Sequence, residues 1–332
     1  MLSKQNILKQ DLNSVLSNFN FRNIILVEPM STSGNVSYII TTALGKYFLR
    51  LSPDKGPRYR SISEIHSEIE LLYYLRKNHF PVLLPIKGKD GRSMISIKNH
   101  NGYIRKFVED NARESPNPGE VEEFGQALGR FHSLIRNFST KNKREHIFDL
   151  ERTKEFFKED MKYIMNSKFK YKKKFITIIN SSLEYMNFPK YLPSGMIHED
   201  LGKRHVLWRE DKISYIIDFD RTYYGKIILD FGQACRGWCF TNNWSKWSNE
   251  NFKHLLKGYS KRRKLTEIEK RYLIDAIKFA IIERAISFSL RFIGKTKDPE
   301  DEKYALHSVL ENGLLDMIEK NRKEIENILK EI

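Results

Sequence analysis

The first hundred residues alternate apolar and polar positions with a period of two, which is typical of half-buried strands. This period predicts strands at residues 23–28, 36–42, 46–51, 82–86, 93–97 and 103–109. Apolar residues spaced three or four apart predict two amphipathic helices in the same region, at residues 1–19 and 63–75. In the second of these helices the spacing places four side chains on the buried face: Ile65, Ile69, Leu72 and Leu75.

Residues 111–119 are the clearest break in composition, because they hold Pro116, Pro118 and Gly119. Beyond them, helical spacing predominates over residues 120–135, 149–185 and most of 229–332. Two short strands, 206–208 and 213–217, are expected to flank a polar turn. The pattern therefore predicts an α+β fold with two lobes. These are a small N-lobe of antiparallel sheet, residues 1–107, and a larger, mostly helical C-lobe, residues 108–332.

Composition adds constraints on class and compartment. Hydrophobic residues make up 40% of the chain and aromatic residues 12%, as in globular proteins. The longest apolar run, residues 279–288, is interrupted by Glu283 and Arg284, so no membrane span is expected. The N-terminal residues lack the apolar core of a signal peptide, and a cytoplasmic protein is expected. The two cysteines, Cys235 and Cys239, exclude a disulfide framework and are expected as small core residues on one helix.

The chain carries a formal net charge of +16. Its Lys and Arg residues are nevertheless dispersed, with short clusters only at 168–174 and 261–264. This dispersal favours compositional bias over a nucleic-acid-binding stripe, so nucleic acid is not an expected partner. The same surface charge disfavours polycationic substrates unless acidic residues line the site locally.

The strongest candidate chemistry lies between Met196 and Arg221. A loop reads Met-Ile-His198-Glu-Asp200, and the second short strand ends in Ile-Ile-Asp218-Phe-Asp220. A hairpin between Asp200 and Asp218 is expected to hold both carboxylates at one end of its sheet. One carboxylate can accept a proton from an attacking hydroxyl, and the other can hold a magnesium ion that bridges nucleotide phosphates. Either element alone is common by chance, and the two in this order favour the catalytic interpretation.

His-x-Asp followed by Ile-Asp-Phe-Asp resembles the catalytic loop and metal-binding segment of the aminoglycoside phosphotransferase and choline kinase-like superfamily, which has a protein-kinase-like fold. The segments Ala-Leu-Gly129-Arg-Phe-His132-Ser-Leu and Leu-Asp230-Phe-Gly extend the resemblance. They place the chain nearest the branch of type II homoserine kinases and stress-response kinases. His132 is expected to be structural, because it lies on a core helix.

The resemblance implies an ATP-dependent kinase that moves a γ-phosphoryl group to a hydroxyl of a small molecule. It gives Asp200 the role of base and Asp218 that of magnesium ligand. It also implies that His198 supports the loop geometry and that Asp220 braces the segment after Asp218.

The resemblance implies a nucleotide site in the N-lobe as well. A turn of small polar residues would cover the phosphates: Ser31, Ser33, Gly34 and Asn35. Arg50 stands where kinases place the strand lysine that holds phosphates, and Glu68 is expected to pair with it, with Glu64 as the alternative partner. Phe107 and Val108 belong to the connector that binds adenine through its backbone.

His205 departs from the family pattern, which has Asn at this position as a second magnesium ligand. Magnesium prefers oxygen ligands, so an imidazole is a poor replacement. Three interpretations follow: one metal suffices, a metal such as manganese is used through His205, or phosphoryl transfer is lost. Two alternatives to a small-molecule kinase therefore stay open, a protein Ser/Thr kinase and a nucleotide-binding pseudokinase.

Overall fold

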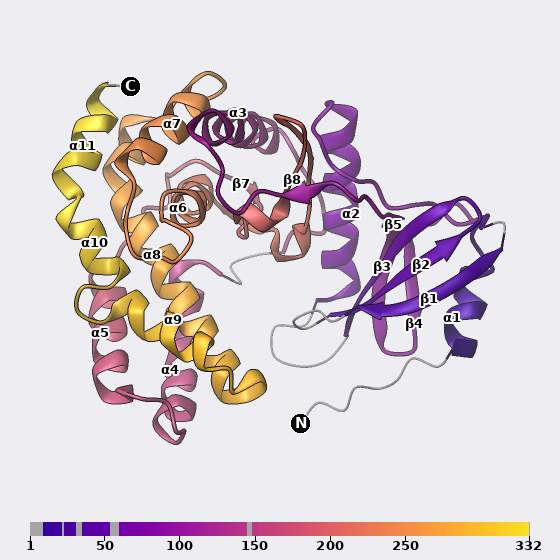
Figure 1. Ribbon diagram of the computed structural model, residues 1–332, viewed down its shortest axis with the longest axis horizontal. Coiled ribbons are helices and arrows are strands. Elements are labelled where there is room, and N and C mark those ends of the chain that lie inside the picture. The colour runs from indigo at the N-terminus through magenta and orange to yellow at the C-terminus, as the bar shows by residue number, and fades with distance from the viewer. Residues whose placement is uncertain (1–8, 22, 31–34, 54–59, 145–147, 332) are drawn as a thin grey trace. The chain divides into compact units, whose positions relative to one another are not determined.

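The computed structural model describes residues 9–21, 23–30, 35–53, 60–144 and 148–331. These residues form two compact units (Figure 1). Unit 1 takes its described residues from Met1–Asn111, Ser139–Arg144 and Tyr215–Asp220. Unit 2 takes its own from Ala112–Phe138, Glu145–Ser214 and Arg221–Ile332. Asp218 thus belongs to unit 1 and Asp200 to unit 2, and the expected lobe boundary at residue 108 stays a prediction.

Unit 1 is built on a five-stranded antiparallel sheet with the strand order β1-β2-β3-β5-β4. Its strands are β1 (Ile24–Met30), β2 (Val36–Thr42), β3 (Gly45–Pro53), β4 (Met94–Ile97) and β5 (His100–Lys106). The register places Arg50 of β3 between Ser37 of β2 and Tyr103 of β5. Arg50 therefore lies on the central strand of the sheet and not on an edge.

Two helices complete unit 1 in the described residues. Helix α1 (Lys9–Leu16) packs Leu12 and Leu16 against the apolar side chains of the sheet. Helix α2 (Ile62–Lys77) begins with a capping box between Ser61 and Glu64, which satisfies backbone donors of its first turn. The side chains of α2 predicted to face inward are all buried: Ile65, Ile69, Leu72 and Leu75.

The strand predicted at residues 82–86 is wrong. Only an isolated bridge between Pro85 and Arg105 forms there. Pro81 and Pro85 have no backbone N–H to donate to a ladder, so the buried Val82 and Leu83 belong to an irregular segment.

Unit 2 is mostly helical. Its long helices are α3 (Pro118–Ile135), α4 (Leu150–Met165), α5 (Lys172–Tyr185), α6 (Ile227–Trp238), α7 (Asn249–Ser260), α8 (Glu267–Arg291), α9 (Pro299–Val309) and α11 (Arg322–Glu331). Shorter helices are η1 (Lys203–His205), η3 (Phe292–Thr296) and α10 (Leu314–Lys320), and η2 (Phe219–Arg221) lies where the chain returns from unit 1. β7 (Ser194–Ile197) pairs with β10 (Tyr223–Lys226). A third sheet is formed by β6 (Asn111–Ala112), β8 (Val206–Arg209) and β9 (Lys212–Ile216), and the divisions between the two units fall within β6 and β9. The α+β prediction is confirmed.

The helical segment predicted at 149–185 is broken between α4 and α5. Ser167 ends α4 locally, because its hydroxyl donates to the Ile164 carbonyl at 2.7 Å and accepts from the Phe169 N–H at 3.1 Å. The polar turn predicted between two short strands is confirmed. Thr266 and Glu269 form the capping box of α8, and Glu210 makes the turn between β8 and β9 with a φ of 51°.

Helix α6 lies at the centre of unit 2, and each of its residues is buried. Its Trp238 stacks on Phe124 of α3 with ring centroids 3.9 Å apart. Cys235 and Cys239 are buried free thiols at its C-terminal end, as predicted. Because α6 is held on all sides, it is a rigid support for the loop that follows β7. Within the described part of the chain, no helix is both long and apolar enough to cross a bilayer.

Candidate functional site

The loop after β7 is fixed by Asp230 of α6. The fully buried Asp230 carboxylate accepts the backbone N–H of His198 at 3.0 Å and that of Glu199 at 2.7 Å. Glu199 has a φ of 71°, a conformation that L-residues rarely adopt. These hydrogen bonds hold the loop in that strained form, so α6 determines where the next residue, Asp200, is presented.

Asp230 is itself held by a chain of buried side chains. Nε2 of His132 donates to Asp230 at 3.1 Å, and Nδ1 of His132 lies 2.9 Å from the hydroxyl of Tyr259. Arg263 donates to the same hydroxyl and to Glu269. Burial lowers the pKa of His132 below its ordinary value, so the imidazole acts here as a neutral bridge.

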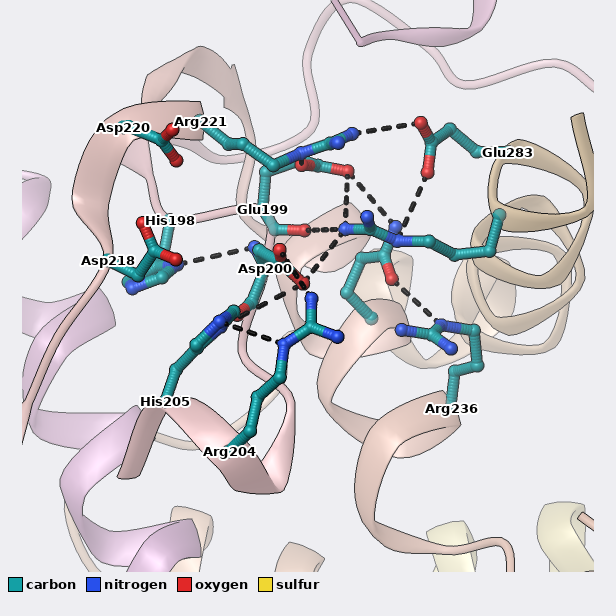
Figure 2. A network of polar contacts seen from close by, with 12 residues as sticks. His198, Glu199, Asp200, Arg204, His205, Asp218, Asp220, Arg221, Arg236 and Glu283 are labelled. Carbon is teal, nitrogen blue, oxygen red and sulfur yellow. Dashed lines mark hydrogen bonds and ion pairs between the residues drawn. The ribbon is translucent and has the colours of Figure 1, made fainter. Parts of the chain in front are cut away.

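Asp200 lies among cations (Figure 2). Its Oδ1 is 3.0 Å from Nη2 of Arg284, and its Oδ2 accepts from Nη2 of Arg204 at 3.2 Å. The backbone N–H of Asp200 donates to Nδ1 of His198 at 3.3 Å. Burial opposes ionisation, but Arg284 and its cationic neighbours hold the pKa of Asp200 well below its ordinary value. Asp200 is therefore a carboxylate at neutral pH, with its side chain only 9% exposed.

Both ring nitrogens of His205 have hydrogen-bond partners, one in Asp200 and the other in Arg204. Nδ1 lies 2.5 Å from the carbonyl oxygen of Asp200, and because a carbonyl only accepts, Nδ1 carries the proton. Nε2 then accepts a hydrogen bond from Nε of Arg204 at 2.9 Å. Arg204 thus contacts both the imidazole of His205 and the carboxylate of Asp200 (Figure 2).

A second set of charges surrounds Glu199, the residue before Asp200. Its carboxylate accepts from Arg221 and from Nε2 of Gln233, the latter at 3.2 Å. Arg221 also donates to Glu283 of α8 at 2.9 Å. Arg236 lies beyond Gln233 and donates to its amide oxygen at 3.0 Å. These partners of Glu199 were not predicted from the sequence. The available signal was the charged pair Glu283 and Arg284, which interrupts the apolar face of α8.

Burial raises the pKa of Glu199 to about 7, although Arg221 and Arg284 act against this shift. A carboxyl group whose pKa is higher in the folded state stabilises the fold below its unfolded pKa, and this stability is lost as pH rises through 7. We therefore expect Glu199→Gln to gain stability relative to the wild type by about 2–3 kcal/mol between pH 5 and pH 8. Urea unfolding of both proteins at the two pH values measures this difference. An unchanged difference would show that Glu199 is ionised throughout.

In unit 1, Arg50 brings Asp218 and Asp220 together. Its Nη1 donates to Oδ1 of Asp218, and its Nη2 donates to Oδ2 of Asp220 at 2.6 Å. Asn35 donates to the same oxygen of Asp220 at 3.1 Å and accepts from Ser52 at 2.9 Å. Asp218 has a φ of 72°, a strained conformation of the kind that concentrates at functional sites.

The charge states of this group follow from its contacts. Burial works against the guanidinium, but Asp220 and Asp218 raise the pKa of Arg50 above its ordinary value. Burial and the neighbouring Asp218 raise the pKa of Asp220 despite Arg50. The cation of the central strand is therefore permanent, and it holds the segment 218–220 in place.

The predicted ion pair between Arg50 and Glu68 is wrong, because it does not form among the described residues. Glu68 accepts instead from Arg60 and, at 2.7 Å, from the hydroxyl of Tyr103. Glu64, the alternative partner, pairs with Arg144 at 2.9 Å. Arg50 pairs instead with the carboxylates of Asp218 and Asp220. The buried Glu68 is neutralised by Arg60.

Three of the predicted phosphate-binding residues, Ser31, Ser33 and Gly34, lie outside the described residues. Phe107 and Val108 are half-buried, and the Phe107 N–H donates to the Lys46 carbonyl at 2.9 Å. Among the described residues, no group of three or more His, Cys, Asp and Glu side chains could hold a metal ion. That Asp200 and Asp218 face one another stays a prediction.

Comparison with known proteins places this chain in a family. The model of the phosphotransferase enzyme family matches residues 29–265, more than half of the chain. A homoserine kinase of Zymomonas mobilis subsp. mobilis is 24% identical over 281 residues, which cover 80% of this chain and 83% of the relative. A homoserine kinase of Bradyrhizobium diazoefficiens is 23% identical over 245 residues, covering 71% and 69%.

Solved structures agree on the fold. An amicoumacin kinase in complex with AMP-PNP and Ca²⁺ superposes with a TM-score of 0.69 at 17% identity, covering 96% of this chain and 92% of the other. A microcompartment-associated aminopropanol kinase gives a TM-score of 0.67 at 16% identity, covering 96% and 98%. The predicted kinase-like fold and the predicted resemblance to homoserine kinases are confirmed. The family and the homoserine kinase relatives confirm the expectation of a kinase. The chain therefore belongs to the phosphotransferase enzyme family.

Proposed function

We propose that the protein transfers the γ-phosphoryl group of ATP to a hydroxyl of a small molecule, with Asp200 as the catalytic base. The observation that carries this proposal is the state of Asp200: buried, ionised, and held by Arg284 and Arg204 on a loop anchored to Asp230. A carboxylate fixed in this way can orient an acceptor hydroxyl and take its proton as transfer proceeds. His198 supports the loop by accepting the N–H of Asp200.

The oxygen chemistry of Asp218 fits a divalent metal ion. Magnesium is commonly bound by one or two carboxylates together with substrate phosphates, so a site without three clustered protein ligands is sufficient. The ion would neutralise charge on the phosphates. Asp218 would hold it, and Asp220 would brace the segment through Arg50. His205 does not fit, because both of its nitrogens are already engaged.

Arg50 is proposed to steady the nucleotide phosphates, since its guanidinium suits bidentate contact with phosphate oxygens. Ser31, Ser33, Gly34 and Asn35 are proposed to cover those phosphates, and the backbone of Phe107 and Val108 to bind adenine. Glu68 acts through Arg60 and Tyr103 by fixing α2 against β5.

Small alcohols are the proposed acceptors. The curated relatives are named homoserine kinases, and one structural neighbour is an aminopropanol kinase. Release of ADP in the presence of L-homoserine, 1-amino-2-propanol, ethanolamine or choline tests this directly. A protein kinase would instead place phosphate on added protein, and a pseudokinase would bind nucleotide without turning over any acceptor.

Asp218→Asn tests the nucleotide and metal site. ATP with magnesium at about 100 times its Kd is expected to stabilise the wild type by about 2.7 kcal/mol, which raises Tm by several degrees. Asp218→Asn is expected to lose the metal-dependent part of this rise, and the exposed Asp211→Asn is the matched control that keeps it. Thermal unfolding with and without the metal measures both. A rise that needs no metal in the wild type would contradict the role of Asp218.

A further inference from the structure

The second metal position of the family does not fit the residues of this chain. A metal bound by histidine needs a lone pair on a ring nitrogen, and a neutral imidazole has one such lone pair. In His205 the proton is on Nδ1, which faces the Asp200 carbonyl oxygen at 2.5 Å. The remaining lone pair, on Nε2, accepts from Nε of Arg204 at 2.9 Å. His205 therefore has no lone pair to offer while Arg204 is in place.

Arg204 also changes the electrostatics of this position. The same guanidinium that meets His205 through Nε meets Asp200 through Nη2 at 3.2 Å. A permanent positive charge thus already stands beside the carboxylate, and it repels a dication that approaches either partner. Figure 2 shows Arg204 directed at both residues.

This arrangement belongs to the loop itself. Arg204 and His205 are consecutive in η1. They lie four and five residues after Asp200 in sequence, and both contact it. The neighbouring Lys203 takes no part, because its Nζ donates to Asn242 at 3.0 Å. Of Lys203 and Arg204, the two cations of η1, Arg204 is therefore the one that contacts the Asp200 carboxylate.

We infer that Arg204, fixed against His205, takes the place of a second metal ion, so that the protein binds one divalent ion with each nucleotide. This inference rests on the proposed ATP-dependent function and on Asp218 as the ligand of that single ion. Arg204 acts as a positioning residue, because it works through the charge and orientation of Asp200.

The test counts metal ions per bound nucleotide. The full-length protein is saturated with AMP-PNP and titrated with Mn²⁺, and protein-bound ions are separated from free ions by ultrafiltration. Electron paramagnetic resonance measures the free Mn²⁺ and the spin coupling between bound ions. One bound Mn²⁺ per nucleotide, without spin coupling, is the expected result for the wild type.

The double variant Arg204→Ala with His205→Asn removes the guanidinium and supplies an amide oxygen. It is expected to bind a second Mn²⁺, and the two ions would broaden each other's signal. Arg204 has a side chain 67% exposed, so its removal leaves the packed core intact. Lys203→Ala is the matched control for loss of a neighbouring cation and is expected to keep one ion.

The outcomes separate this inference from the function on which it rests. Two coupled ions in the wild type would overturn the inference and leave the proposed kinase function standing. A double variant that stays at one ion would also overturn it, because Arg204 and His205 would then not be what excludes the second ion. No nucleotide-dependent Mn²⁺ in the wild type would refute the proposed function together with the inference.

Discussion

Asp200→Asn is expected to lower kcat by roughly 10³-fold, within the range that a positioned general base contributes. The amide has nearly the same shape but cannot take a proton from the acceptor hydroxyl. It also loses the negative charge that Arg284 and Arg204 now share. Because Asp218 is untouched, the stabilisation by ATP and metal is expected to remain.

The measurement is steady-state ADP release with the best acceptor found for the wild type. Thermal unfolding with ATP and magnesium, run on the same preparation, shows whether the nucleotide site has survived. A kcat within about tenfold of the wild type would remove Asp200 from the role of base. A loss of nucleotide binding in parallel would mean that the variant is damaged more widely, and Asp200→Glu would then distinguish the two effects.

Asp230→Ala is expected to lower the free energy of unfolding by about 3–5 kcal/mol, because it removes one partner from a buried polar network. The alanine leaves the N–H groups of His198 and Glu199 without their acceptor, and it leaves His132 without the carboxylate at its Nε2. Asp230 and His132 are both fully buried, so water cannot replace these contacts without opening the core.

Urea unfolding at pH 7 measures the change, with the exposed Asp211→Ala as the matched surface control. Asp230→Asn keeps one acceptor oxygen and is expected to fall between the wild type and the alanine variant. A loss below about 1 kcal/mol for Asp230→Ala would mean that the loop is held by other contacts. The activity of folded Asp230→Asn protein should fall as well. Asp230 anchors the backbone of His198 and Glu199, and Asp200 is the next residue of that loop.

Local spacing was sufficient for most of the secondary structure. The buried face of α2 and the hairpin of β8 and β9 depend on residues close in sequence. The failures also have local causes that an apolar period does not show. Two prolines prevent a ladder at 82–86, and the hydroxyl of Ser167 ends α4.

The sequence by itself determined the family and the residue types of the candidate site, because those lie in two short motifs around Asp200 and Asp218. Only the tertiary structure decided the pairing of charges. Arg50 meets Asp218 and Asp220 across more than 160 positions of chain, whereas Glu68 meets Arg60, so the predicted pair fails. Arg284 contacts Asp200 from a helix that is distant in sequence. Arg204, adjacent to His205 in sequence, donates a hydrogen bond to Nε2 of that imidazole. A buried charge pairs with the oppositely charged group that the packed chain brings within hydrogen-bonding distance. The periodicity of a sequence does not predict that distance.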